Sequence, residues 1–258
     1  MQNFDIFIPC APKDHHKIPF VMASIQKHLT GYEKIFLVSP TRIDRRHLVG
    51  VPIPYYEHTD QAVLNVDRRL WKFRPNWCYQ QHLKLFQELT SGWYLTLDSD
   101  VIFNRHIDFW NGDKPIWWVG AEQNYEPYFI FNQCMIGLPR IAPHTFIADF
   151  NLFNRQIIWE MLKNNDYDIS SFCQKSQMIT RKECCMAEPE IYGNYCHKYH
   201  PDMYEIRQLK TEGAGRMQNL DTETQWDHGE IEAVVKQTLA KDVDTIHIHS
   251  WYNEGAKL

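Results

Sequence analysis

Two aspartates, Asp98 and Asp100, stand one residue apart directly after a short apolar run, a spacing that could bind a divalent cation. The run, Trp93 to Leu97, has the length and apolar character of a buried strand. Carboxylates this close can face one ion where the backbone turns at a strand end, and hard oxygen ligands suit Mg²⁺ or Mn²⁺. Such an ion in turn binds a diphosphate and offsets the charge that develops as the diphosphate departs.

The same Asp-x-Asp spacing recurs at 166–168 and 242–244, so the pattern alone is weak. Only Asp98-Ser99-Asp100 follows a five-residue apolar strand and precedes a second apolar run, 101–103. The alternative is a turn in which the Asp side chains bond the local backbone.

A second feature lies near the end of the chain, where His247 and His249 alternate with apolar residues. Alternate residues of a strand share a face, so both imidazoles are expected to point the same way. A neutral imidazole is a good third ligand for Mn²⁺. The alternative is a pair of edge-strand histidines that bind nothing.

The elements that must position these residues begin with a β-α-β unit, which is typical of a parallel sheet. Its parts are a strand at 5–8, a helix at 18–29 and a strand at 35–38. The stretch Val51 to Tyr56 is predicted as an edge strand, since its prolines bar a central position. In open sheets of this kind, ligands bind beyond the carboxyl ends of the strands, where Asp98 is expected.

Further elements follow the same rules: helices at 76–89 and 230–240, strands at 93–97, 115–119 and 245–249, and an extended piece followed by a helix within 146–163. No repeat, low-complexity segment or linker interrupts them. We therefore expect one α/β domain over 1–258, with a mixed, mostly parallel central sheet flanked by helices. This domain would have two halves, residues 1–103 and 104–258.

Composition excludes several classes. The net charge is −5 with no basic run, which argues against a nucleic-acid partner. No stretch approaches the ~18 apolar residues of a membrane span, and the first ten residues do not form a signal peptide. Seven scattered cysteines, an odd number, indicate reduced thiols and a cytoplasmic location.

The order of these features resembles the GT-A class of glycosyltransferases, whose single Rossmann-like domain binds a nucleotide sugar through Asp-x-Asp and a divalent metal. Four segments also resemble a narrower, largely uncharacterised family of GT-A-like proteins from bacteria and large viruses. These segments are Trp77 to Leu85, Leu95 to Asp100, Phe146 to Asn151 and Glu188 to Tyr195.

The resemblance implies a hexosyl- or pentosyltransferase that moves a sugar from a UDP- or GDP-sugar to a glycan or other hydroxyl acceptor, with Mn²⁺ or Mg²⁺. Residues 1–103 would form its nucleotide-binding half and 104–258 its acceptor-side half. Asp100 would bind the metal, Asp98 the metal or the donor ribose, and His249, or alternatively His247, would be the late metal ligand. The donor would also contact the loop after the first strand and the middle of the motif: Pro9, Cys10, Ala11, Lys13 and Ser99.

Gln80 and Lys84 lie four apart, on one face of the helix before the motif. Lys84 could meet a donor phosphate or hydroxyl, or be a solvated helix lysine. Asp149 and Asn151 alternate in an extended stretch and could bind sugar hydroxyls, or serve a turn or cap. Glu190 is the candidate general base for an inverting transfer, with Asp149 as the competing carboxylate.

Three other interpretations stay open. The first is a catalytically inactive protein that binds nucleotide sugars, and the second is a metal-dependent phosphodiesterase or nucleotidyltransferase, which also uses paired carboxylates. The third is a zinc site, although no C-x-x-C pair is present. Its ligands would come from Cys173, Cys184, Cys185, Cys196, His197 and His200.

Overall fold

A five-stranded sheet forms the centre of the protein, in the order β3-β2-β1-β4-β8. The computed structural model describes residues 2–90, 92–180, 185–213, 228–238 and 240–248. Strands β1 to β4 run parallel to one another, and β8 runs antiparallel to β4. The strands are β1 (Phe4–Pro9), β2 (Tyr32–Ser39), β3 (Tyr56–Thr59), β4 (Trp93–Leu97) and β8 (Phe150–Asn154). The expected α/β class with a mixed, mostly parallel sheet is confirmed.

Two three-stranded sheets accompany the central one, in the orders β10-β11-β5 and β6-β7-β9. In the first, β11 pairs antiparallel with β5, placing His247 opposite Val101. This pairing brings the late strand to the Asp98–Asp100 turn, and the Ile248 amide donates to the Asp100 carbonyl at 2.8 Å. The strands are β5 (Val101–Phe103), β6 (Trp110–Asn111), β7 (Lys114–Val119), β9 (Glu205–Gln208), β10 (Thr211–Gly213) and β11 (Thr245–His247).

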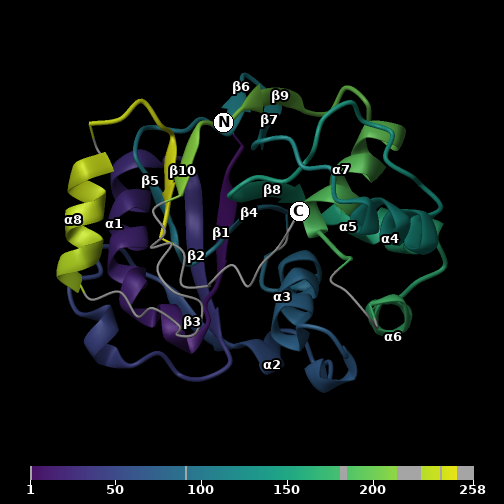
Figure 1. Ribbon diagram of the computed structural model, residues 1–258, viewed down its shortest axis with the longest axis horizontal. Helices are drawn as coiled ribbons and strands as arrows, with labels where there is room; N and C mark the ends of the chain where they lie inside the picture. Colours follow the sequence, from purple (N-terminus) through teal and green to yellow (C-terminus); the bar gives the residue numbers. More distant parts are fainter. Residues whose placement is uncertain (1, 91, 181–184, 214–227, 239, 249–258) are drawn as a thin grey trace.

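Helices cover both faces of the central sheet (Figure 1). Helices α1 (Ile18–His28) and α8 (His228–Thr238) lie on one side. On the other lie α3 (Pro75–Phe86), α4 (Glu126–Ile136), α5 (Arg155–Asn164), α6 (Ile169–Ile179) and α7 (Glu188–Tyr199). The short helices are α2 (Asp60–Val63) and the 3₁₀ turns η1 (Pro12–Lys17), η2 (Arg45–Leu48) and η3 (Arg68–Leu70).

The alternation of side chains along the strands builds two cores. In β1, Ile6 and Ile8 pack with α1, whereas Phe7 packs with α3 on the opposite face. Because helices cover both faces, the central strands β1 and β4 and the second half of β2 are buried and mostly apolar, whereas the edge strand β3 is polar and largely exposed. None of the described helices is long and apolar enough to cross a membrane.

The edge strand differs from the prediction. It was expected at 51–56 but covers Tyr56–Thr59, still at the edge of the sheet. Pro52 and Pro54 have no amide hydrogen to donate to β2, so the ladder begins only after them. The predicted strand at 93–97 matches β4, and the helix predicted at 76–89 begins at Pro75 and ends at Phe86.

One buried titratable group, His82, belongs to α3 itself. His82 is fully buried, its Nδ1 lies 2.7 Å from the Cys78 carbonyl, and its ring packs on Trp71 at 4.7 Å. Its Nε2 has no hydrogen-bond partner among the described residues. Burial lowers the His82 pKa to about 4, so the imidazole is neutral at pH 7.

We predict that His82 makes the protein less stable as pH falls from about 6.5 toward 4. In this window the unfolded chain binds a proton that the folded chain does not, so the free energy of unfolding rises with pH. The full difference is at most ~3 kcal/mol. Urea unfolding across this range should show a shallower pH dependence for His82→Leu than for wild type. His106→Gln, at an exposed position, is the control, and an unchanged slope in His82→Leu would contradict the assignment.

Candidate active site

Lys84 joins three elements at the carboxyl end of β4. Its Nζ lies 2.8 Å from Asp98 Oδ1 and 3.0 Å from Glu188 Oε1, the latter on the first turn of α7. Gln80, one turn earlier on α3, donates to Asp98 Oδ1 at 3.1 Å. The shared helix face of Gln80 and Lys84 thus points at the motif, and Lys84 is buried rather than solvated.

Glu188 is the carboxylate that sequence reasoning missed. It is 2% exposed, and its Oε2 has no hydrogen-bond partner among the described residues. Burial raises the Glu188 pKa, while Lys84 acts in the opposite direction. Burial alone would lower the Lys84 pKa, but Asp98 and Glu188 outweigh it and raise the pKa above its ordinary value. Lys84 is therefore a buried ammonium held between two carboxylates.

The loop after β1 also reaches the motif. Cys10 is buried, its thiol donates to the Ala11 carbonyl at 3.6 Å, and Ser99 and Asp100 lie close enough to influence its pKa. Burial raises the Cys10 pKa, so the thiol stays neutral. From the same loop, Lys17 pairs with Asp14 at 2.8 Å and donates to the Ile248 carbonyl. The predicted donor loop and the motif thus meet, and Lys17 anchors the loop to the end of β11.

His247 is held by Asp149. Its Nε2 lies 2.7 Å from Asp149 Oδ2, which also accepts from the Thr211 and Thr245 hydroxyls. Burial would lower the His247 pKa, but Asp149, then Asp100 and Asp98, raise it to about 9. Burial would likewise raise the Asp149 pKa, but His247 lowers it. The two form a buried ion pair whose imidazolium would have to lose its proton to bind a metal.

The described residues offer two carboxylates for a cation. The Asp98 side chain is 38% exposed, and its Oδ2 accepts no hydrogen bond from the described residues. In the part of the chain that is described, no three His, Cys, Asp or Glu side chains gather as a metal site. The predicted ligand His249 lies outside the described residues. One or two carboxylates with substrate phosphates are what Mg²⁺ commonly uses, so Asp98 and Asp100 fit that role.

Glu190 points away from this cluster. It is fully buried, and Oε1 accepts from the Thr145 hydroxyl at 2.6 Å and the Phe146 amide at 2.8 Å. Oε2 accepts from Asn194 at 3.1 Å. Oε1 thus holds the loop that leads to Asp149, and Oε2 is engaged within α7 itself, an arrangement that suits positioning better than proton transfer.

Asn151 is likewise turned inward. It is buried on β8 opposite Thr96, and its amide, oriented to donate, reaches the Phe146 and Phe150 carbonyls at 3.2 Å each. The amide therefore supports the loop before β8 rather than facing a ligand.

The other Asp-x-Asp pairs have structural roles. Asp168 caps α6 in a reciprocal pair with Ser171. Asp242 and Asp244 both pair with Arg105, at 2.7 and 3.1 Å. Of the proposed zinc ligands, Cys184 lies outside the described residues, Cys173, Cys185 and Cys196 are buried in the core, and His200 bonds Glu160. These positions give the zinc hypothesis no support.

No protein-family model and no curated protein sequence matches the chain. Two solved structures resemble it in outline. Mouse xyloside xylosyltransferase 1, in its apo form, has a TM-score of 0.48 at 10% identity, over 96% of this chain and 98% of that one. The galactosyltransferase LgtC, in complex with donor and acceptor sugar analogues, has a TM-score of 0.45 at 12% identity, over 98% and 88%. At these scores the likeness carries no conclusion about activity.

We predict that Lys84→Met lowers the free energy of unfolding by about 3–5 kcal/mol at pH 8, because it leaves Glu188 buried without its cation. The partly exposed Asp98 is screened by water and adds little. Adding Glu188→Gln should restore part of the loss, and the loss should shrink as pH falls and Glu188, whose pKa is raised by burial, takes up a proton. Urea unfolding measures all three, with Lys163→Met on the exposed face of α5 as control. If the changes in the free energy of unfolding from Lys84→Met and Glu188→Gln simply add, the two side chains do not stabilise each other and the prediction is wrong.

Proposed function

We propose that the chain is a glycosyltransferase that moves a sugar from a UDP- or GDP-sugar to a hydroxyl of a glycan or similar acceptor, with Mn²⁺ or Mg²⁺. The observation that carries the proposal is the meeting of Asp98, Asp100, Lys84 and the loop after β1 at the carboxyl ends of β1 and β4. Ligands of open α/β sheets bind at this edge.

Different residues of the site would bind different parts of the donor. The loop Pro9, Cys10, Ala11 and Lys13 would hold the base and ribose, next to Ser99. Asp98 would bind the ribose or the metal, and Asp100, with His249, would bind the metal. A divalent cation bound there would offset the charge of the departing diphosphate. His247 enters the proposal as the partner of Asp149 rather than as a ligand, because Asp149 engages its Nε2.

The reaction exchanges one bond of the anomeric carbon for another. The bond to the β-phosphate oxygen breaks with its electron pair on the diphosphate, and a bond forms to the acceptor oxygen, which loses its proton. If the transfer inverts configuration, a carboxylate must take that proton. Glu188 is the better-placed candidate, since burial raises its pKa and its Oε2 lacks a hydrogen-bond partner among the described residues. Glu190 has both oxygens engaged.

One observation favours a second function, an inactive protein that binds nucleotide sugars. Lys84 and Gln80 both occupy Asp98 Oδ1, one of the oxygens that a metal would need. Such a protein would bind the donor without turnover. The phosphodiesterase or nucleotidyltransferase alternative needs more clustered carboxylates for a two-metal site, and the described residues do not supply them.

We predict that a nucleotide sugar raises the melting temperature only when Mn²⁺ is present. Adjacent carboxylates and a β-phosphate repel one another unless a cation lies between them, and a ligand of the folded state raises its stability. A thermal-shift panel of UDP- and GDP-sugars, with Mn²⁺ or with EDTA, measures this. Asp100→Asn should remove the Mn²⁺-dependent shift and abolish transfer while the apo melting temperature stays near wild type. Equal shifts in Mn²⁺ and EDTA would rule out the metal site.

We predict that, for an inverting transfer, Glu188→Gln lowers turnover by ~10²–10⁴ while donor binding persists, because the amide cannot accept the proton. Glu190→Gln should instead lower stability, since its amide nitrogen cannot accept the hydrogen bonds that the carboxylate accepts. Parallel kinetics and thermal melts of Glu188→Gln, Glu190→Gln and Asp149→Asn separate the roles. A large rate loss at Glu190 or Asp149, with a near-normal rate at Glu188, would show that Glu188 is not the base.

A further inference from the structure

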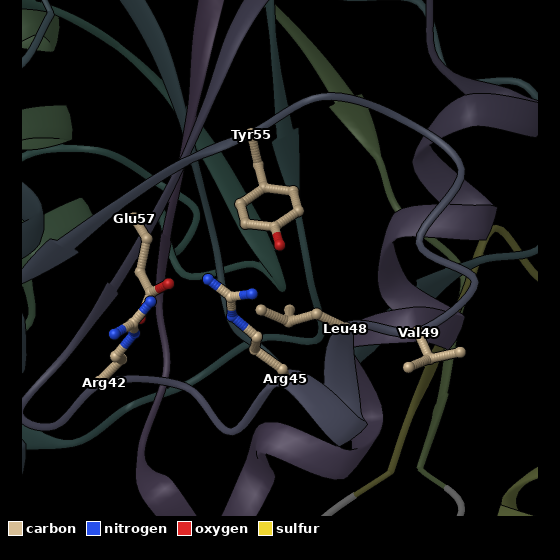
Figure 2. Close-up of a pocket in the computed structure, with 6 residues that line it drawn as sticks. All are labelled: Arg42, Arg45, Leu48, Val49, Tyr55 and Glu57. Carbon is tan, nitrogen blue, oxygen red and sulfur yellow. The ribbon is translucent and has the colours of Figure 1, made fainter.

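A cavity of about 430 Å³ lies between the loop that follows β2 and the edge strand β3 (Figure 2). It is built from the chain between β2 and the start of β3, whereas the candidate active site is built from β1, β4, α3 and α7. Its volume falls in the range of small-molecule sites. Its lining is Arg42, Arg45, Leu48, Val49, Tyr55 and Glu57.

The two arginines of this cavity are unusual in the protein. Within the described residues, Arg42 and Arg45 make no ion pair, side-chain hydrogen bond or ring contact. Each of the other eight described arginines makes at least one: Arg46, Arg68, Arg69, Arg74, Arg105, Arg140, Arg155 and Arg207. Two guanidinium groups without an acidic partner thus lie at one cavity of a chain whose net charge is −5.

The acidic residues near Arg42 and Arg45 form hydrogen bonds with other groups. Asp44 accepts a backbone and a side-chain hydrogen bond from Arg46, so its charge is paired with Arg46. Glu57 Oε1 accepts from the Ile43 amide at 2.8 Å. The Tyr55 hydroxyl makes no hydrogen bond within the described chain, and Figure 2 shows it directed toward the Arg45 side chain. The cavity therefore combines two cations with a free hydroxyl and a second, unengaged carboxylate oxygen of Glu57.

We infer that this cavity binds a phosphorylated carbohydrate, at a site separate from the donor. Guanidinium groups recognise phosphate oxygens with strong, charge-assisted hydrogen bonds. The Tyr55 hydroxyl and Glu57 Oε2 match the hydroxyl groups of a sugar, and Leu48 offers an apolar edge to its C–H groups. The single carboxylate disfavours a ligand that is anionic throughout and favours one with a charged end and a neutral polyol end.

Isothermal titration calorimetry of the full chain with glucose 6-phosphate tests the site, with inorganic phosphate and glucose as probes of the two ends. Glucose 6-phosphate should bind at least tenfold more tightly than either. Arg42→Gln and Arg45→Gln should each weaken it about tenfold, and Tyr55→Phe by a few-fold. Arg46→Gln is the matched control, since Arg46 lies in the same loop but is paired with Asp44, and it should bind within twofold of wild type.

Two further measurements test whether the variants act on binding at this cavity alone. Melting temperatures of the variants should stay near wild type, because both arginines are exposed. Asp100→Asn should bind glucose 6-phosphate normally, which separates this cavity from the candidate active site. The inference is overturned if glucose 6-phosphate does not bind, if it binds no better than phosphate, or if Arg42→Gln and Arg45→Gln bind as well as Arg46→Gln.

Discussion

The buried ammonium of Lys84 is the constraint on which the candidate site depends. Removing a cation from water costs several kcal/mol unless acceptors surround it closely. Here the acceptors come from two other elements, Asp98 after β4 and Glu188 at the start of α7. Helix α3 must therefore present Lys84 to both at once, which fixes α3 and α7 against the end of β4. The orientation of Asp98 follows from the same contacts, since Lys84 and Gln80 hold one of its oxygens.

The late strand β11 closes the site from the other side. The Ile248 amide bonds Asp100, its carbonyl accepts from Lys17, and His247 pairs with Asp149. These three contacts tie the C-terminal strand to the motif, to the loop after β1 and to the start of β8. Glu190 adds a fourth tie by holding the loop before Asp149. Residues far apart in the chain thus reach one place through buried polar contacts, each costly to leave unmade.

Local patterns predicted β1, β2, β4 and β7 and the helices α1 and α3, because apolar periodicity and proline act over short distances. The end of β4, and hence the place of Asp98, could be read from five apolar residues alone. The pairing of His247 with Asp149 could not, since it spans 98 positions and depends on how β11 docks against β5. The same limit explains Glu188 and Glu190. Two residues apart at the start of one helix, they point to different neighbours, and only the packing of α7 shows which one faces Lys84.

The charges around the motif also bear on the cation. Four carboxylates, Asp98, Asp100, Asp149 and Glu188, stand with two cations, Lys84 and His247. If all six groups are ionised, their net charge is −2. Lys84 and His247 stabilise the ionised carboxylates beside them, and Asp98 and Asp100 in turn raise the His247 pKa. Asp14 and Lys17 pair and leave the sum unchanged. In the proposed function, a single divalent ion would neutralise this net charge of −2, whereas a second metal ion would leave an excess of positive charge. A diphosphate could offset that excess, but no three His, Cys, Asp or Glu side chains of the described residues gather as a metal site, so the proposed function takes one ion.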